Sequence, residues 1–211
     1  MKIGVIGSGV VGQQLGLGLT KLGHEVKLGT RDTSKLNDWL KQAGGNATTG
    51  SDEEAAKFGE LIVLCTRWDG TENALKLAGK SNFSGKIVMD VTNPLTHTTP
   101  PGLDASPGNS GGEKIQKWLP DSKVVKAFNI INAYIMANPK REEGDPSLLI
   151  CGNDEDAKDQ VKKFAEGWGW KSIIDMGDIS EAYWIEALTM LWIHYGFKNN
   201  KWSHAFKLLK K

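Results

Sequence analysis

The chain has 211 residues, in which 26 Lys and Arg nearly balance 25 Asp and Glu, and it contains two cysteines. A formal net charge of +1 provides no basic field that would attract nucleic acid or an anionic membrane surface. Cys65 and Cys151 each fall at or near the end of an apolar strand, where we expect small core residues rather than a disulfide. The ligand spacings of zinc and iron–sulfur sites are absent from the sequence, so no metal is expected.

The sequence also argues against membrane insertion and secretion. The most apolar stretch, residues 183–197, contains Glu186 and His194 and is too short to span a bilayer. The first predicted strand follows Met1 directly, which leaves no room for a signal peptide. We therefore expect a cytoplasmic protein without a membrane partner.

The first predicted element is a short apolar strand that runs into a glycine-rich turn and then a helix. Lys2 to Ile6 has the Ile and Val content of a buried parallel strand. The G-x-G-x-x-G turn that follows permits a tight bend, close approach to a pyrophosphate, and close packing of helix on strand. The free N–H groups of the helix N-terminus then favour phosphate. The residues expected to bind a dinucleotide here are Gly7, Ser8, Gly9, Val10, Val11 and Gly12.

The end of the second strand indicates which dinucleotide is bound. NAD-binding proteins usually carry an acid there, which accepts a hydrogen bond from the ribose 2′-hydroxyl. After Glu25 to Leu28 this chain has Gly29, Thr30 and Arg31, so a hydroxyl and a guanidinium are available for a 2′-phosphate. Lys35 adds a second positive charge nearby. We therefore predict NADP, the alternative being a solvated loop in which Asp32 pairs with the arginine.

The remaining elements alternate between helix and strand. This alternation, with short connections, predicts an α/β fold: a Rossmann-type, doubly wound, mostly parallel sheet with a small helical C-terminal portion. Helices are predicted at 33–44, from the Ser51 capping box, at 70–79, 112–119, shortly after Asn132, at 154–166, and from a second capping box at 178–181 to about Tyr195. Strands are predicted at 61–65, 86–90, 123–128, 147–151 and 171–174.

In such sheets the ligand lies across the carboxyl ends of the strands, where the strand order reverses. Three predicted loops at that edge carry residues that could line a nicotinamide: a tryptophan for a wall, an arginine for a phosphate or an anionic substrate, and amides for the carboxamide. These residues are Thr66, Arg67, Trp68, Asn93, Pro94 and Asn129. Each has an ordinary structural alternative, as a turn or a core residue. The long Pro- and Gly-rich loop at 93–112 is typical of a functional or mobile segment.

A general acid is hard to find. Only His97, in the long loop, is placed to reach a substrate, and it is the candidate catalytic residue. The Tyr-x-x-x-Lys pair of short-chain carbonyl reductases is absent. An NADP enzyme without a proton donor favours an acceptor that takes a bare hydride, such as a flavin-type ring, because positioning of two rings then provides most of the catalysis.

The terminal helix is apolar on nearly every side, with residues such as Trp184, Leu188 and Leu191, and so requires cover on two faces. A homodimer interface is the first interpretation, and the alternatives are packing on its own sheet or one wall of a substrate pocket. We divide the chain into an NADP-binding domain at 1–178 and a helical segment at 179–211.

Three segments carry a family resemblance: GVIGSGVVGQQLGLGLTKLGHEVKLGTRD, VTNPL and LPDSKVVKAFNIINA. They resemble the deazaflavin (coenzyme F-420)-dependent NADP reductase family over residues 1–195. The region around KAFN and LLICGNDEDAKDQVKKFAE is also similar to the NADPH-binding domain of six-transmembrane metalloreductases. The resemblance implies a Rossmann core, a dimer, NADP phosphate contacts at Thr30, Arg31 and Lys35, and hydride transfer to a deazaflavin or flavin. Asn129 stands where the deazaflavin reductases tend to carry histidine.

Three functional hypotheses follow. The first is an NADP-dependent oxidoreductase that passes hydride between NADPH and a deazaflavin, a flavin or a related small electron acceptor. The second is a reductase of small carbonyl or imine compounds, with His97 or a water as proton source. The third is a non-catalytic NADP-binding module that senses redox state.

Overall fold

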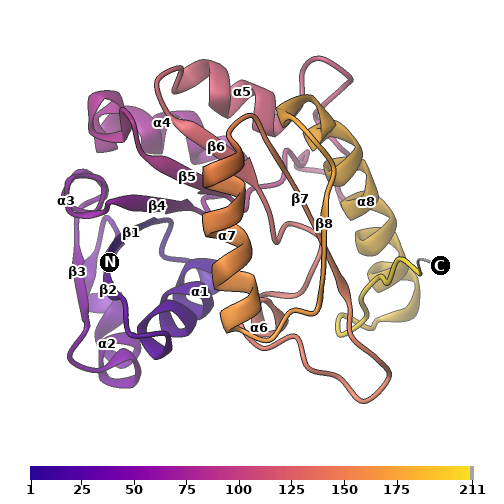
Figure 1. Cartoon of the computed structure of the whole chain (residues 1–211), viewed down its shortest axis with the longest axis horizontal. Coiled ribbons are helices and arrows are strands. Elements are labelled where there is room, and N and C mark those ends of the chain that lie inside the picture. Colours follow the sequence, from indigo (N-terminus) through magenta and orange to yellow (C-terminus); the bar gives the residue numbers. More distant parts are fainter. Residues whose placement is uncertain (210–211) are drawn as a thin grey trace.

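A computed structural model describes residues 1–209 and shows an eight-stranded sheet with helices on both faces (Figure 1). The strands lie in the order β3-β2-β1-β4-β5-β6-β7-β8. The first six of them in space are parallel, β7 is antiparallel to β6, and β8 is parallel to β7. The order reverses between β1 and β4, which is the switch point of a doubly wound sheet. The predicted fold class is therefore confirmed.

The strands are short, and those in the centre are apolar on both faces. They are β1 (Lys2–Ile6), β2 (Glu25–Gly29), β3 (Ala47–Gly50), β4 (Leu61–Leu64), β5 (Ile87–Asp90), β6 (Lys123–Lys126), β7 (Ser147–Gly152) and β8 (Ser172–Asp175). Every residue of β4 is buried, as expected for a strand covered on both sides. The strand β3 is the one that the sequence analysis did not place.

Two hydrophobic cores lie on opposite faces of the sheet. One is formed by α1 (Val10–Lys21), α2 (Asn37–Ala43), α6 (Ala133–Met136) and α7 (Glu155–Gly167). The other is formed by α3 (Asp52–Phe58), α4 (Trp68–Ala78), α5 (Gly111–Trp118) and α8 (Ala182–Asn199). In Figure 1, β7 and β8 lie between α7 and α8. Within residues 1–209, each helix is too short or too polar to cross a membrane.

Several predicted boundaries were wrong by a few residues. The segment predicted as one helix at 33–44 is a 3-10 helix, Thr33–Leu36, followed by α2. The capping box predicted at Ser51 forms, and the structure adds one at Ser110 that was not predicted. The box predicted at 178–181 does not form: Asp178 accepts from Ser180 and caps a 3-10 helix, Ile179–Glu181. The terminal helix starts only afterwards, and it runs to Asn199. The inner face of this helix packs on α5 and β7. The division of the chain into a domain at 1–178 and a helical segment at 179–211 stays a prediction.

A buried ion-pair network connects the sheet with α8. The ammonium of Lys126, at the end of β6, lies 2.9 Å from an Asp90 oxygen and 2.8 Å from a Glu186 oxygen, and all three side chains are fully buried. Lys126 also donates to the carbonyl oxygen of Thr92 at 2.7 Å. Burial by itself lowers the pKa of Lys126, but Asp90 and Glu186 outweigh it and raise that pKa above its usual value. The lysine is therefore charged at neutral pH.

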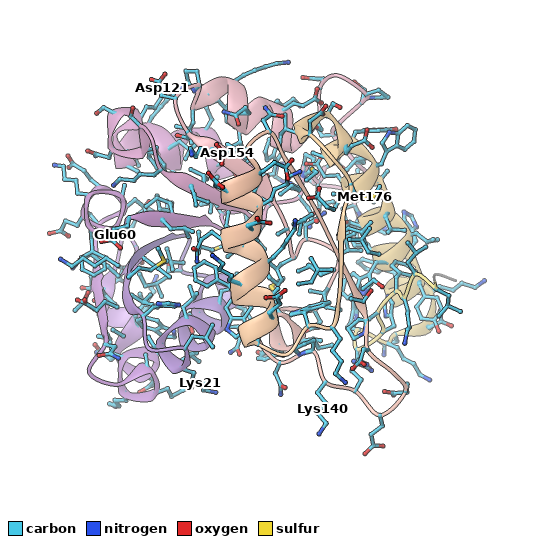
Figure 2. The ribbon with its side chains drawn as sticks, in the orientation of Figure 1. Lys21, Glu60, Asp121, Lys140, Asp154 and Met176 are labelled. Carbon is cyan, nitrogen blue, oxygen red and sulfur yellow. The ribbon has the colours of Figure 1, made fainter. Side chains whose placement is uncertain are left out.

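We expect Lys126→Met to lower the free energy of unfolding by about 3–5 kcal/mol, because it leaves two buried carboxylates without a countercharge. Urea unfolding followed by tryptophan fluorescence measures this loss. Lys123→Met is the matched control from the same strand. Lys123 pairs at the surface with Asp154, at the start of α7 (Figure 2), over 2.9 Å, with side chains 42% and 31% exposed. Its loss should be much smaller, and equal losses would contradict the role assigned to Lys126.

Candidate functional site

The glycine-rich turn after β1 has the geometry that the sequence predicted. Gly7 has φ 112°, which L side chains rarely adopt. A Cβ at Gly12 would collide with the carbonyl oxygen of Gly7, so the third glycine allows α1 to pack against the turn. A Cβ at Gly9, in contrast, would meet no atom within 4 Å. The turn therefore leaves open space at the position expected to approach a pyrophosphate.

The N-terminus of α1 opens onto this space. Gly9 is the residue before the helix, and no side chain from residues 1–209 caps it. The first N–H groups of α1 therefore remain available to a negatively charged group. Gln13 fixes the turn from behind, since its side-chain amide donates to the carbonyl oxygen of Ser8 at 2.9 Å.

Two adjoining cavities lie at the carboxyl edge of the parallel strands. The β2-side cavity, about 490 Å³, includes the residues after β2; the β5-side cavity, about 480 Å³, includes the residues after β5. They share Gly9, Cys65, Thr66, Arg67 and Asp69. Together they have the common wall expected for a dinucleotide that passes over the glycine turn.

Of the three residues after β2 that were predicted to bind the 2′-phosphate, two line the β2-side cavity and one does not. Ser8 donates from its hydroxyl to that of Thr30 at 3.1 Å, which ties the glycine turn to the end of β2. Thr30 and Arg31 line the β2-side cavity. Lys35 does not line it and lies 3.5 Å from Asp32, with 78% of its side chain exposed.

The alternative in which Asp32 neutralises the arginine is not what the structure shows. Asp32 accepts from the backbone N–H and the hydroxyl of Ser34, at 3.1 and 2.6 Å, and pairs with Lys35. The Ser34 hydrogen bonds and the charge of Lys35 hold the pKa of Asp32 below its usual value. Arg31 has no ion-pair partner among residues 1–209 and is exposed. Its guanidinium therefore remains available for an anion.

After β4, Thr66, Arg67 and Trp68 lie where the two cavities meet. Thr66 and Arg67 line both, and Trp68 lines the β5-side cavity. Trp68 was predicted in a loop but is the first residue of α4, and its ring stacks on Trp118 with centroids 5.7 Å apart. The ammonium of Lys114 lies 5.5 Å from the Trp68 ring centre. Trp68 thus forms a wall of the β5-side cavity, with its ring stacked on Trp118 and the Lys114 ammonium over its face.

The two asparagines predicted to line the nicotinamide have different positions. Asn93 lines the β5-side cavity and donates to the backbone oxygen of Asn129 at 2.9 Å. Asn129 is 4% exposed and lines neither cavity; its amide donates to Asn93 at 3.0 Å and to Thr189 of α8 at 2.9 Å. Pro94 is buried and also lies outside the cavity walls. Asn129 therefore positions Asn93 and connects it to α8.

His97 is brought to the β5-side cavity, and it is the only histidine of residues 1–209 that lines either cavity. Its side chain is 71% exposed, with Nε2 4.0 Å from an Asp69 oxygen.

Cys65 lies on the shared wall, where its thiol donates to the Gly7 carbonyl oxygen at 3.3 Å. Desolvation raises the pKa of Cys65 well above its usual value, so this thiol is protonated and uncharged. Groups of His, Cys, Asp and Glu able to hold a metal are absent from the described part of the chain.

Sequence reasoning missed two features of the site. Asp52, from α3, lines the β2-side cavity, and Lys126 holds the carbonyl oxygen of Thr92 on the wall of the β5-side cavity. The sequence offered two signals for the role of Lys126: it is a charged residue at the end of an apolar strand, and Glu186 lies within an apolar helix. No linear pattern marks Asp52, because it meets β2 only after folding.

The fold and the cavities define a Rossmann-type dinucleotide-binding protein. A family model described as "NADP oxidoreductase coenzyme F420-dependent" matches residues 2–94. The F420-dependent NADP reductase of Methanocaldococcus jannaschii is 33% identical over 214 residues, which cover 94% of this chain and 93% of that protein. The chain therefore belongs to the F420-dependent NADP reductase family, and by this membership it is an NADP-dependent oxidoreductase.

Comparisons of structure agree with this assignment. A crystal structure assigned as an F420-dependent NADP reductase, from Arthrobacter sp. FB24, is 36% identical and superposes with a TM-score of 0.93 over the full length of both chains. Metalloreductase STEAP3 of Rattus norvegicus is 30% identical over 190 residues, which are 90% of this chain and 36% of that protein. An imine reductase of Myxococcus stipitatus, solved with NADP⁺, shares the fold, with 13% identity and a TM-score of 0.72 over 95% of this chain and 63% of that chain.

Proposed function

We propose that this protein transfers a hydride between NADPH and a small deazaflavin- or flavin-type acceptor. The observation that carries the proposal is the pair of adjoining cavities with a common wall at Gly9, Cys65 and Thr66. A hydride passes only between molecules in contact, and these cavities would seat two molecules side by side. The names of the M. jannaschii and Arthrobacter relatives, which pair NADP with F420, support the same acceptor class.

The residues present fit NADP. Open space at Gly9 and the uncapped start of α1 suit a pyrophosphate, and Thr30 and Arg31 suit a 2′-phosphate. Bound NADPH supplies the hydride, so the protein has to bind and orient two rings and exclude water. Trp68, Val91 and Leu95 give the β5-side cavity apolar walls, and Asn93 is held there by Asn129. A ring acceptor spreads the added charge over its own conjugated system and requires no acid from the protein.

One observation favours a second candidate. His97 lines the β5-side cavity, and a histidine beside a carboxylate can deliver a proton. Reduction of a small carbonyl or imine compound would use this group. We place it second because the side chain is largely exposed and lies 4.0 Å from Asp69, beyond a hydrogen bond.

NADPH oxidation, followed at the nicotinamide absorbance band, tests the proposal. Coenzyme F420, FMN, FAD, a ferric chelate and a small cyclic imine are offered separately. We expect rapid oxidation with a deazaflavin or flavin ring. Turnover with the imine alone, abolished in His97→Ala, would favour the second candidate. Silence with all of them, despite tight NADPH binding, would favour an NADP-binding sensor.

We expect Arg31→Glu to weaken NADPH binding by about 10- to 100-fold, because a charge-assisted hydrogen bond to a phosphate contributes about 1.5–3 kcal/mol. NADH binding should change little, since NADH lacks the 2′-phosphate. Calorimetric titration of both nucleotides measures the two affinities. Lys35→Glu is the matched control, because Lys35 lies outside the cavity. Equal losses of NADPH and NADH affinity in Arg31→Glu would refute the 2′-phosphate site.

We also propose that two copies associate through the outer face of α8. Trp184, Leu188, Leu191 and Tyr195 form one stripe on this helix, and Trp184, Leu191 and Tyr195 are 58%, 59% and 48% exposed. Exposed apolar stripes of this kind usually mark interfaces, and most oligomers of soluble proteins are symmetric homo-oligomers. The same stripe on a second copy, related by a twofold axis, is its natural cover.

Leu191→Glu should convert a dimer into a monomer, because association would bury two charges at the centre of the stripe. Sedimentation velocity at micromolar concentration measures the mass. His194→Glu is a matched control on the same helix, at an exposed position outside the stripe. A wild-type monomer, or a Leu191→Glu variant of unchanged mass, would reject this interface.

A further inference from the structure

Asp52 places a carboxylate in the cavity that we assign to the adenosine half of NADP. It is the first residue of α3 and takes no part in the capping box that Ser51 and Glu54 form. The residue is half-buried and lines the β2-side cavity together with Thr30 and Arg31. A cavity suited to a phosphate therefore also contains an acid.

The Asp52 carboxylate lies against the end of β2. A Cβ built on Gly29, the last residue of β2, would lie 2.6 Å from Oδ1 of Asp52 and 3.0 Å from its Cα. The Asp52 carboxylate thus occupies the space that a side chain at the end of β2 would enter. In NAD-binding sheets that side chain is the acid that accepts from the ribose hydroxyls. Here β2 ends in Gly29, which has no side chain, and Asp52 of α3 places a carboxylate at that position instead.

Asp52 is also free to accept a hydrogen bond. Within residues 1–209 its carboxylate has no hydrogen-bond or ion-pair partner, unlike Asp69, which lies 3.5 Å from Arg67. Burial raises the pKa of Asp52, and the nearby charge of Arg31 opposes that rise. The charge of Asp52 also contributes to the raised pKa of Cys65, after desolvation, which agrees with its position beside the shared cavity wall.

We infer that Asp52 accepts a hydrogen bond from the adenosine ribose and so opposes Arg31 in setting the preference for NADPH over NADH. This inference rests on the proposed function. With NADH, the free 2′-hydroxyl donates to the carboxylate; with NADPH, the same carboxylate faces a 2′-phosphate and repels it. Arg31 and Thr30 favour the phosphate, and Asp52 reduces the difference in affinity between NADPH and NADH. The chain therefore binds NADH better than its NADP-type β2 sequence predicts.

Asp52→Asn tests the inference, because asparagine keeps the size of the side chain and removes its charge. We expect the ratio of the NADH to the NADPH dissociation constant to rise by at least about tenfold, through weaker NADH and tighter NADPH binding. Calorimetric titration gives both constants, and thermal unfolding verifies that the variant is folded. Asp52→Ala provides a second variant, which should move the ratio in the same direction.

Glu53→Gln is the matched control. Glu53 is the neighbour of Asp52 on α3, but it lines neither cavity and pairs with Lys57, so its variant should leave the ratio unchanged. An unchanged ratio in both Asp52 variants would overturn the inference. So would a parallel weakening of both nucleotides, which would mean that Asp52 binds the adenine ring, common to NADH and NADPH. Failure of the wild-type protein to bind NADPH would instead overturn the proposed function.

Discussion

The buried ammonium of Lys126 is the interaction on which the arrangement of the site depends. It joins Asp90 at the end of β5, Glu186 of α8 and the carbonyl oxygen of Thr92. Three charges without solvent are costly unless each is paired and hydrogen-bonded. Here Asp90 also accepts from the N–H and hydroxyl of Thr92, at 2.8 and 2.7 Å. The network therefore fixes the backbone of Thr92, which lines the β5-side cavity.

The same network explains the end of the long loop at 93–112. Glu186 accepts from the N–H groups of Gly111 and Gly112, at 2.9 and 3.0 Å, and so occupies the positive end of α5. A Cβ at Gly111 would lie 2.8 Å from Oε1 of Glu186, and one at Gly112 would lie 2.7 Å from the Cβ of Ala182. This glycine pair allows α8 to approach α5 closely. A loop that looked mobile from its composition is therefore anchored at both ends.

Local patterns predicted the elements well, and tertiary contacts account for what they missed. The glycine turn could be predicted because two of its constraints are local: Gly7 has a positive φ, and Gly12 packs against the carbonyl oxygen of Gly7 in the same turn. Asn129 could not be placed, since the sequence does not show that its amide faces Thr189, 60 residues away. Phe128 adopts φ 59°, a conformation costly for a residue with a side chain, and it is held there by edge contacts with Trp168 and Trp170. Such a residue resembles ordinary core in the sequence.

The helix α8 connects the proposed dimer with the proposed acceptor site. Its inner face presents Glu186 to Lys126 and Thr189 to Asn129, and Asn129 in turn holds Asn93 on the cavity wall. Its outer face carries the apolar stripe on the opposite side of the same helix. Because side chains in a packed core transmit small shifts, a second copy seated on the stripe would press on the element that positions Asn93. Association would then stabilise the geometry of the β5-side cavity more than that of the β2-side cavity, because Asn93 lines the β5-side cavity and not the β2-side cavity.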